Sequence, residues 1–280
     1  MGISELKVKY HNDMNAISTK NLNEVDLNVF MALCAKAKDK NISEIELSFD
    51  EFIEASGLEK KSTVNTRKKI IDFIDSRYSK FSILEYKKKS DKGLIRFYLV
   101  NRLYVPEDEN VVRMRIDEDF LYILNTNKNF TKFLLSDFVD LKGKYAKNLY
   151  RLLVQYDDTG WADFTLSDFK EYMGIPSGYR PKDITEKVIK PSIEELKAKK
   201  LFNEINYEVK KARNRGAEVK GYHFNFTVAV NDDMNGQLDI FTYMDENGKQ
   251  QFRNKKKNSF NNFPQNTYDF KELEEKLLDN

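Results

Sequence analysis

The spacing of apolar residues predicts one order of elements twice along this chain of 280 residues. Each half shows an amphipathic helix, a short strand, a capped helix, a lysine-rich helix and a basic hairpin. The first copy spans about residues 22–100 and the second about 130–230. This order is typical of the winged helix-turn-helix, so the pattern predicts an α+β protein with two such domains in tandem.

In the first copy, Asn23 is expected to cap a helix that is apolar on nearly every side and therefore central to the core. A strand over 45–49 follows, and then a helix that Asp50 caps and Gly57 ends. The next helix begins at Ser62. We expect its apolar side to face the core, and this side comprises Val64, Ile70, Ile71, Phe73, Ile74 and Tyr78.

The other side of this helix has the short, mixed character of a surface that reads bases. It carries Ser62, Asn65, Lys68, Lys69, Asp72 and Ser76. Arg67 falls on the apolar side, where only snorkelling accounts for it. Strands over 81–86 and 94–100 are predicted to form the wing, because the loop between them has four lysines and Gly93. A strand over 111–116 and a short helix from Asp117 are expected to close this copy.

The second copy opens with a helix whose apolar side is Tyr145, Leu149, Leu152, Leu153 and Tyr156. Its other side, which we expect to face solvent, carries Lys144, Lys147, Asn148 and Arg151. Thr165 should cap the next helix and Gly174 should end it. The next helix is expected over 182–199, with Pro191 kinking it by removing a backbone donor. Its inward side is predicted to comprise Ile184, Val188, Ile189, Ile193 and Leu196. A basic hairpin over 202–230 follows.

We place the domains at residues 1–125, 126–230 and 231–280. The last segment is rich in Asn, Gln and Lys, so we expect a disordered tail that ends in a short helix over 268–278.

Charge is unevenly distributed along the chain, although the net charge is only +2. Residues 60–103 hold 13 Lys/Arg against 4 Asp/Glu, and residues 178–220 hold 12 against 7. Residues 1–59 are acidic, with 6 Lys/Arg against 11 Asp/Glu. A single basic run usually indicates a solvated surface, but two runs at matching places in two similar units favour double-stranded DNA as the partner.

Several classes of protein lack support in the sequence. One cysteine, Cys34, excludes an internal disulfide framework, and its apolar surroundings predict burial. The two histidines, His11 and His223, are far apart and lack paired ligand spacing, so no metal and no cofactor are expected. No phosphate-binding loop, signal peptide or membrane-spanning run is present, which favours a cytoplasmic protein without enzymatic activity.

Four segments resemble the plasmid replication initiators of the Rep_3 (RepA/RepE-like) family. They are NDMN at 12–15, LNEVDLNVFMALCAKAKDK at 22–40, FTKFLLSDFVDLKGKYAKNLYRLLVQYDDTGW at 130–161 and MGIPSGYRPKDITEKVIKPSIEEL at 173–196. The resemblance covers about residues 8–230 and implies two winged helices that bind repeated sequences, called iterons, at a plasmid origin. It also implies a monomer that opens the origin and a homodimer, formed mainly through the first winged helix, that represses its own promoter at an inverted repeat.

By this resemblance the reading helices correspond to 62–80 and 182–199. The residues expected to contact DNA in the first copy are Lys61, Ser62, Asn65, Lys68, Lys69, Lys87, Lys88, Lys89 and Lys92. Those in the second copy are Tyr179, Arg180, Lys182, Asp183, Lys187, Lys190, Lys210, Lys211, Arg213 and Arg215. Ordinary i, i+4 ion pairs, such as Asp183 with Lys187 and Glu186 with Lys190, are the alternative interpretation of the second helix.

The tail contains a peptide, Gln237, Leu238, Asp239, Ile240 and Phe241, that resembles the motif with which bacterial replication proteins bind the sliding clamp. The alternative is that these residues extend or cover the last strand. The expected function is an origin-binding initiator that works with host replication proteins. A winged-helix repressor without origin-opening activity is the alternative, and a DNA-cleaving enzyme built from scattered carboxylates is a third hypothesis.

Overall fold

The computed structural model describes residues 6–37, 44–58, 62–82, 84–87, 94–97, 100–117, 121, 123–125, 129–212 and 218–229. Contacts divide the chain into two units, residues 1–234 and 235–280, and every described residue lies in the first. The predicted tail, with its peptide at 237–241 and its terminal helix, therefore lies outside the described residues.

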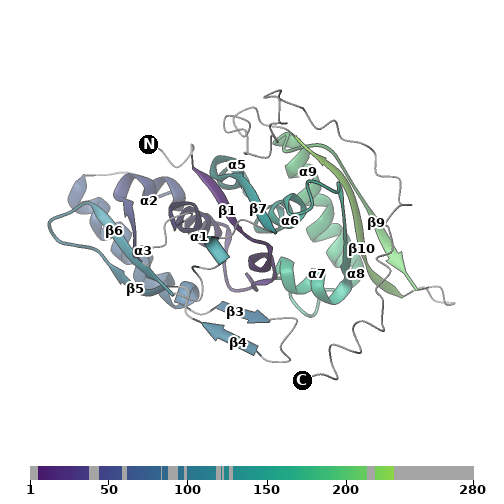
Figure 1. Cartoon of the computed structure of the whole chain (residues 1–280), viewed down its shortest axis with the longest axis horizontal. Coiled ribbons are helices and arrows are strands. Elements are labelled where there is room, and N and C mark those ends of the chain that lie inside the picture. Colours follow the sequence, from purple (N-terminus) through teal and green to yellow (C-terminus); the bar gives the residue numbers. More distant parts are fainter. Residues whose placement is uncertain are drawn as a thin grey trace, which may run out of the picture. The chain divides into compact units, whose positions relative to one another are not determined.

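Among the described residues, the first winged helix consists of three helices and a three-stranded antiparallel sheet (Figure 1). Its elements are α1 (Glu24–Ala37), β2 (Glu44–Ser48), α2 (Phe49–Ser56), α3 (Thr63–Ser82), β5 (Val100–Tyr104) and β6 (Val111–Ile116). The strand order is β2-β6-β5, so β6 lies between its two neighbours and β5 is an edge strand.

The second winged helix repeats this order. Its elements are α6 (Lys144–Val154), β8 (Trp161–Thr165), α7 (Leu166–Met173), α8 (Pro181–Ile184), η3 (Thr185–Ile189), α9 (Lys190–Ala198), β9 (Phe202–Lys211) and β10 (Val219–Val228). The sheet order β8-β10-β9 matches that of the first copy, so the predicted tandem winged helices are confirmed.

Equivalent caps fix the second helix of each copy. Ser48 Oγ accepts a hydrogen bond from Glu51 N at 3.2 Å, and Glu51 Oε2 accepts one from Ser48 N at 2.9 Å, a capping box. The prediction that Asp50 caps this helix is therefore wrong, because the helix begins one residue before it. Thr165 caps α7 as predicted, and Gly57 and Gly174 end the two helices with φ of 67° and 63°.

Helix α1 lies at the centre of the first core, as its apolar circumference predicts. Asn23 caps it, since Asn23 Oδ1 accepts a hydrogen bond from Asp26 N at 2.8 Å. Cys34 is buried with the apolar residues of this helix.

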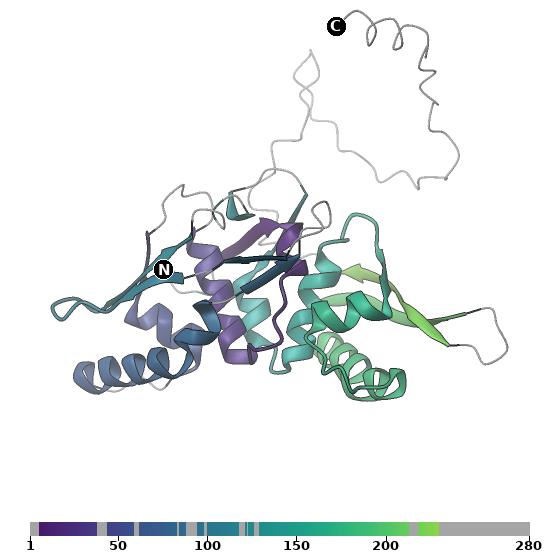
Figure 2. The same cartoon turned by 90° about the horizontal axis from the view of Figure 1, so that it is seen from below.

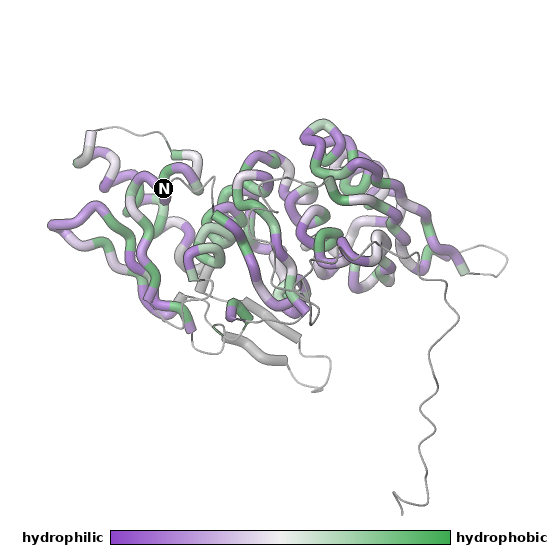
Figure 3. The backbone as a smooth tube through the Cα atoms, turned by 45° about the horizontal axis from the view of Figure 1, so that its top comes forward, coloured by the Kyte–Doolittle hydropathy of each residue, from purple (hydrophilic) through white to green (hydrophobic). Residues whose placement is uncertain are grey.

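The wing of the first copy differs from the prediction. The basic segment forms a separate two-stranded ribbon, β3 (Leu84–Lys87) with β4 (Leu94–Phe97), while Phe81 still belongs to α3. The hairpin that takes the place of β9–β10 is β5–β6, and its turn carries Glu107, Asp108 and Glu109. Figure 3 shows the tip of this hairpin in the purple of hydrophilic residues. Both hairpins have strand periodicity, and only the pairing with β2 decides which one is the wing.

Two strands that precede the winged helices pair with each other. They are β1 (Lys7–His11) and β7 (Phe130–Leu134), and their neighbours η2 (Asn12–Ala16) and α5 (Leu135–Asp140) lead toward α1 and α6. The predicted domain boundary at 125–126 falls between β6 and β7. The pairing of β1 with β7 crosses this boundary, because β1 belongs to the first predicted domain and β7 to the second. Because β1 and β7 precede the two copies and pair antiparallel with Lys9 opposite Lys132, the strand pair itself has an approximate two-fold axis near these two residues.

Candidate nucleic-acid interface

The two expected reading helices lie along the same side of the first unit. Figure 2 shows α3 in blue and the α8–α9 helix in green at the lower edge of the molecule, with the sheets above them. A helix fits the major groove of B-DNA, so two helices on one side can meet two segments of one duplex.

Helix α3 packs through a narrow stripe and exposes the rest of its surface. Thr66, Ile70, Phe73 and Ile74 are buried, whereas Asn65, Lys68 and Ser62 are exposed as predicted. Lys69 is half-buried, and Asp72 and Ser76 are exposed. The predicted burial of Val64 and Ile71 is wrong, since they are 79% and 38% exposed. Val64 lies in the first turn of α3, so it adds an apolar side chain to the exposed surface beside Asn65 and Lys68.

Arg67 holds α3 against the β5–β6 turn. Its guanidinium donates to the carbonyls of Pro106 and Glu109, the latter at 2.7 Å, and stacks over the ring of Phe49 at 5.0 Å from the ring centroid. Arg67 therefore positions the helix-turn-helix relative to the wing, a role that snorkelling did not suggest.

The second reading helix is continuous from Pro181 to Ala198 but has a wide turn at its middle. Residues Thr185–Ile189 are π-helical, and Lys190 N donates to the carbonyl of Thr185, five residues earlier. Pro191 has no N–H, and its ring would clash with the carbonyl of Lys187 in a regular α-helix. The predicted distortion therefore appears as this π-turn. Its predicted inward side is confirmed, because Ile184, Val188, Ile189, Ile193 and Leu196 are all buried.

The outward side of this helix is exposed and internally paired. Lys187 Nζ lies 2.9 Å from Asp183 Oδ1, and Lys190 Nζ lies 2.8 Å from Glu186 Oε1. These hydrogen bonds raise the pKa of both lysines, and the bond from Lys187 lowers the pKa of Asp183. The predicted i, i+4 pairs are thus present, so any anionic ligand of these ammonium groups would compete with carboxylates for them.

The start of the reading helix is held from two sides. Asp183 Oδ2 accepts a hydrogen bond from Arg180 N at 3.2 Å, and Tyr222 donates its hydroxyl to the carbonyl of Pro181 at 3.2 Å. Asp183 is therefore engaged in capping as well as in its pair with Lys187. Exposed Arg180 and Lys182 flank this helix start, and half-buried Tyr179 lies beneath Lys187, whose Nζ is 5.3 Å from the ring centroid.

The second wing contains cations that are only partly paired. Lys210 Nζ lies 2.5 Å from Asp163 Oδ1, and Nδ1 of His223 lies 2.7 Å from the same oxygen. Partial burial opposes ionisation of Asp163, but the hydrogen bonds from Lys210 and His223 outweigh it and lower the pKa of the carboxyl. Lys211 is exposed. Lys61, Lys88, Lys89, Lys92, Arg213 and Arg215 lie outside the described residues, and Lys87 is described only as a backbone position in β3.

A buried polar network joins the two winged helices, and the sequence pattern gave no sign of it. Lys147, Asn148 and Arg151 on α6 are 0% exposed, so their predicted place on a solvent face is wrong. The Arg151 guanidinium donates to Asn148 Oδ1 at 3.0 Å, to Asn15 Oδ1 at 3.2 Å and to the carbonyls of Met14 and Tyr172 at 3.3 Å.

Further contacts of α6 strengthen the connection. Lys147 Nζ donates to the carbonyl of Phe138 at 2.5 Å, and Asn148 Nδ2 donates to Thr19 Oγ1 at 3.0 Å. Glu195 of α9 accepts from the N–H of Gly143 at 3.1 Å and so caps the start of α6. The polar side of α6 therefore contacts η2, the loop before α1, α7 and α9, and its residues connect the two copies.

The described residues contain no group of His, Cys, Asp and Glu side chains that could hold a metal ion. No described helix is long and apolar enough to cross a membrane. His11 accepts a hydrogen bond from Asp13 N at 3.2 Å and caps η2, which is a structural role.

Two family models match this chain: Initiator Replication protein, WH1, over residues 7–154, and Initiator Rep protein, WH2, over residues 165–226. The chain belongs to this initiator replication protein family. The first match ends with the last residue of α6, and the second begins at the cap of α7. The predicted family resemblance is confirmed.

The chain is also similar to individual proteins. It is 27% identical over 191 residues to a protein described as probable replication protein rep from Bifidobacterium longum (strain NCC 2705), a match that covers 67% of this chain and 63% of that relative. A solved structure, the Pi initiator protein in complex with iteron DNA, shares the fold with a TM-score of 0.59 at 14% identity. That likeness covers 81% of this chain and 99% of the Pi chain.

Proposed function

We propose that this initiator binds direct repeats at a plasmid origin through both reading helices and has no enzymatic activity. The placement of α3 and α8–α9 on one side of a unit with a continuous buried core carries the proposal. Membership of the replication initiator family and the Pi complex with iteron DNA support it.

Extending the approximate two-fold axis of the β1–β7 pair to the two copies adds a geometric expectation. Paired helix-turn-helix units read half-sites separated by about 34–36 Å, or roughly one helical turn. Each repeat should therefore contain two contacted segments about one turn apart on the same face of the duplex.

Three measurements separate the initiator from its alternatives. Footprinting should show two protected windows on each repeat, and melting of a supercoiled origin should accompany binding. A repressor alone would bind without opening the DNA. Metal-dependent nicking of the same plasmid would indicate the DNA-cleaving enzyme.

We further propose that the initiator forms a homodimer through β5 and represses its own promoter at an inverted repeat. Strand β5 is the edge of its sheet, and a groove of about 570 Å³ runs between it and α3. Tyr104 and Ile71, which are 46% and 38% exposed, line this groove. Antiparallel pairing of two β5 strands would satisfy their edge backbone groups and cover both side chains.

Sedimentation tests the dimer. Tyr104→Lys should shift the initiator to a monomer and weaken binding to an inverted repeat, while affinity for a single direct repeat stays unchanged. An unchanged dimer would contradict the assignment of β5.

The tail peptide remains a separate proposal, docking on the sliding clamp of the host. Leu238 and Phe241 would supply the buried anchors, since short peptides bind through a few apolar side chains. Replacing both by Ala should abolish clamp binding while the thermal midpoint and repeat affinity stay unchanged. A large fall in the thermal midpoint would instead favour a core role.

A further inference from the structure

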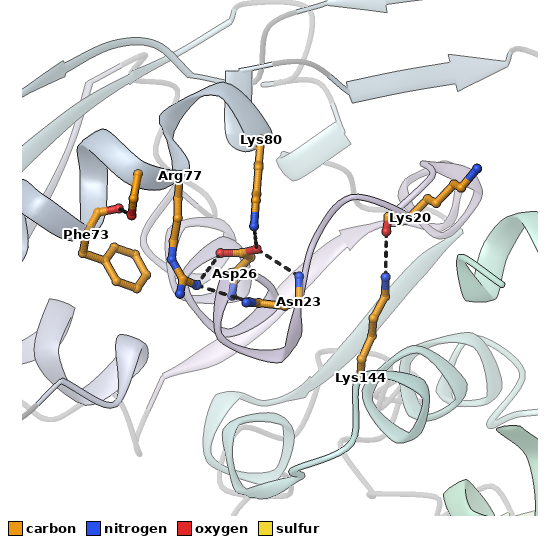
Figure 4. Close-up of polar contacts among 8 residues, drawn as sticks. Lys20, Asn23, Asp26, Phe73, Arg77, Lys80 and Lys144 are labelled. Carbon is orange, nitrogen blue, oxygen red and sulfur yellow. Dashed lines mark hydrogen bonds and ion pairs between the residues drawn. The ribbon is translucent and has the colours of Figure 1, made fainter. Parts of the chain in front are cut away.

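Four cations lie where the two winged helices meet. They belong neither to the outward faces of the reading helices nor to the wings. They are Lys20 in the loop before α1, Arg77 and Lys80 in the last turns of α3, and Lys144 at the start of α6, and we call them the junction cluster. Figure 4 shows Arg77 and Lys80 reaching Asp26 while Lys144 reaches the backbone of Lys20.

One carboxylate serves two of these cations. Asp26 is 0% exposed, with Arg77 Nη1 2.8 Å from Oδ1 and Lys80 Nζ 3.3 Å from Oδ2. The same Oδ2 also accepts a hydrogen bond from Asn23 N at 2.9 Å. The carboxylate is therefore fully engaged, and a positive charge remains on the Arg77–Lys80 side.

The other two cations have no carboxylate partner among the described residues. Lys144 Nζ donates to the carbonyl of Lys20 at 2.8 Å, which uses one of its three donors. Burial lowers the pKa of Lys144, the charge of Lys80 lowers it further, and Asp26 and Glu24 only partly oppose this. Lys20 is exposed. The cluster is therefore short of negative charge.

The fold fixes the cluster between the two helix-turn-helix units. Thr19 accepts a hydrogen bond from Asn148 of α6, and Lys20 packs on Gly174, the residue that ends α7. A Cβ at Gly174 would lie 3.0 Å from the Cα of Lys20, so the loop approaches α7 as closely as only glycine permits. Figure 2 shows the lower end of α1, in purple, between α3 and the α8–α9 helix on the side where both lie.

We propose that the junction cluster binds the phosphates of the DNA backbone between the two major-groove sites, so that it forms a third contact that is independent of sequence. The inference rests on the proposed function. A duplex that meets both reading helices must pass the junction, where it presents one negative charge per about 1.7 Å of axis. A purely structural role would be met by the pair of Arg77 with Asp26 and by the hydrogen bond from Lys144 to the carbonyl of Lys20, and it would not need the exposed ammonium group of Lys20.

Removing the charge of Lys20 or of Lys144, the two cations that form no ion pair with a described carboxylate, tests the proposal. Lys20→Ala removes an exposed side chain, and Lys144→Gln keeps a donor for the carbonyl of Lys20. Lys7→Ala is the matched control, because it removes the same charge from β1 on the other side of the unit. The salt dependence of binding to a repeat and to a random duplex is measured for each full-length variant.

Each cluster variant should reduce the slope of log affinity against log salt by about one unit, and should weaken both duplexes alike. Ethylation interference should lose its signal only at phosphates between the two major-groove windows. Slopes equal to that of Lys7→Ala would overturn the proposal, and Lys20→Ala decides the matter if Lys144→Gln fails to fold. A wild type without preference for the repeat would instead refute the proposed function itself.

Discussion

Replacement of Arg151 by Met tests whether the buried network holds the two winged helices together. The side chain is wholly buried, and its partners come from η2, α6 and α7. Met has similar length but no donor, so the variant removes the hydrogen bonds while it keeps much of the packing.

The expected loss of stability depends on which hydrogen bonds each acceptor keeps after Arg151 is replaced. The carbonyl of Met14 still accepts from Ile17 N at 3.1 Å, and Asn15 Oδ1 still accepts from the Tyr10 hydroxyl at 3.0 Å. Asn148 Oδ1 and the carbonyl of Tyr172 lose the partner that Arg151 provides. The loss of a hydrogen bond at these two acceptors lowers the free energy of unfolding by about 2–6 kcal/mol in all. The variant no longer buries a charged guanidinium, which offsets part of this loss. We expect the free energy of unfolding to fall by about 3 kcal/mol.

Urea unfolding of the full-length protein measures this loss. A double-mutant cycle with Asn15→Leu should show a coupling energy above about 1 kcal/mol, because Asn15 bonds Arg151 directly. Iteron affinity should fall as well, although Arg151 cannot touch DNA. A loss below about 1 kcal/mol, or additive effects in the cycle, would refute the reasoning.

Three other changes test separate parts of the interface. Replacing Lys187 and Lys190 by Ala should weaken repeat binding by about tenfold or more and erase one of its two footprint windows, whereas a normal footprint would remove α8–α9 as the reader. Replacing Glu107 and Asp108 by Lys should tighten binding to all duplexes alike, because the native turn repels phosphates; unchanged affinity in gel shifts would place this wing away from DNA. Burial lowers the pKa of Lys147 to about 7 in the folded protein. Above that pH, Lys147 is therefore more fully protonated in the unfolded chain than in the folded protein. Stability should therefore rise with pH from about 7 to 9, by up to about 1 kcal/mol per unit, and urea titrations of Lys147→Met should lack this slope.

The sequence predicts elements well where local chemistry decides them. The sequence predicts both α2 and α7 as capped helices that end at a glycine, Gly57 and Gly174, although it predicts the cap of α2 at Asp50 where the structure has Ser48. The inward side of α8–α9 also follows from periodicity, because one continuous apolar stripe meets one core.

Features set by distant contacts were missed. The polar side of α6 has the spacing of a solvent face, and only the approach of Asn15 and the Lys20 loop shows that it is buried. Likewise the basic ribbon β3–β4 and the acidic hairpin β5–β6 both have strand periodicity, and pairing with β2 through β6 distinguishes them. Periodicity describes one element at a time, so it cannot reveal which layers lie against it.

Binding to the direct repeats beside the initiator's own gene, in competition with random duplex at physiological salt, tests the central claim most directly. The account predicts affinity for the repeat at least about a thousandfold above that for random DNA, with two protected windows roughly one helical turn apart. Equal affinity for both duplexes, or a single protected window on each repeat, would contradict it.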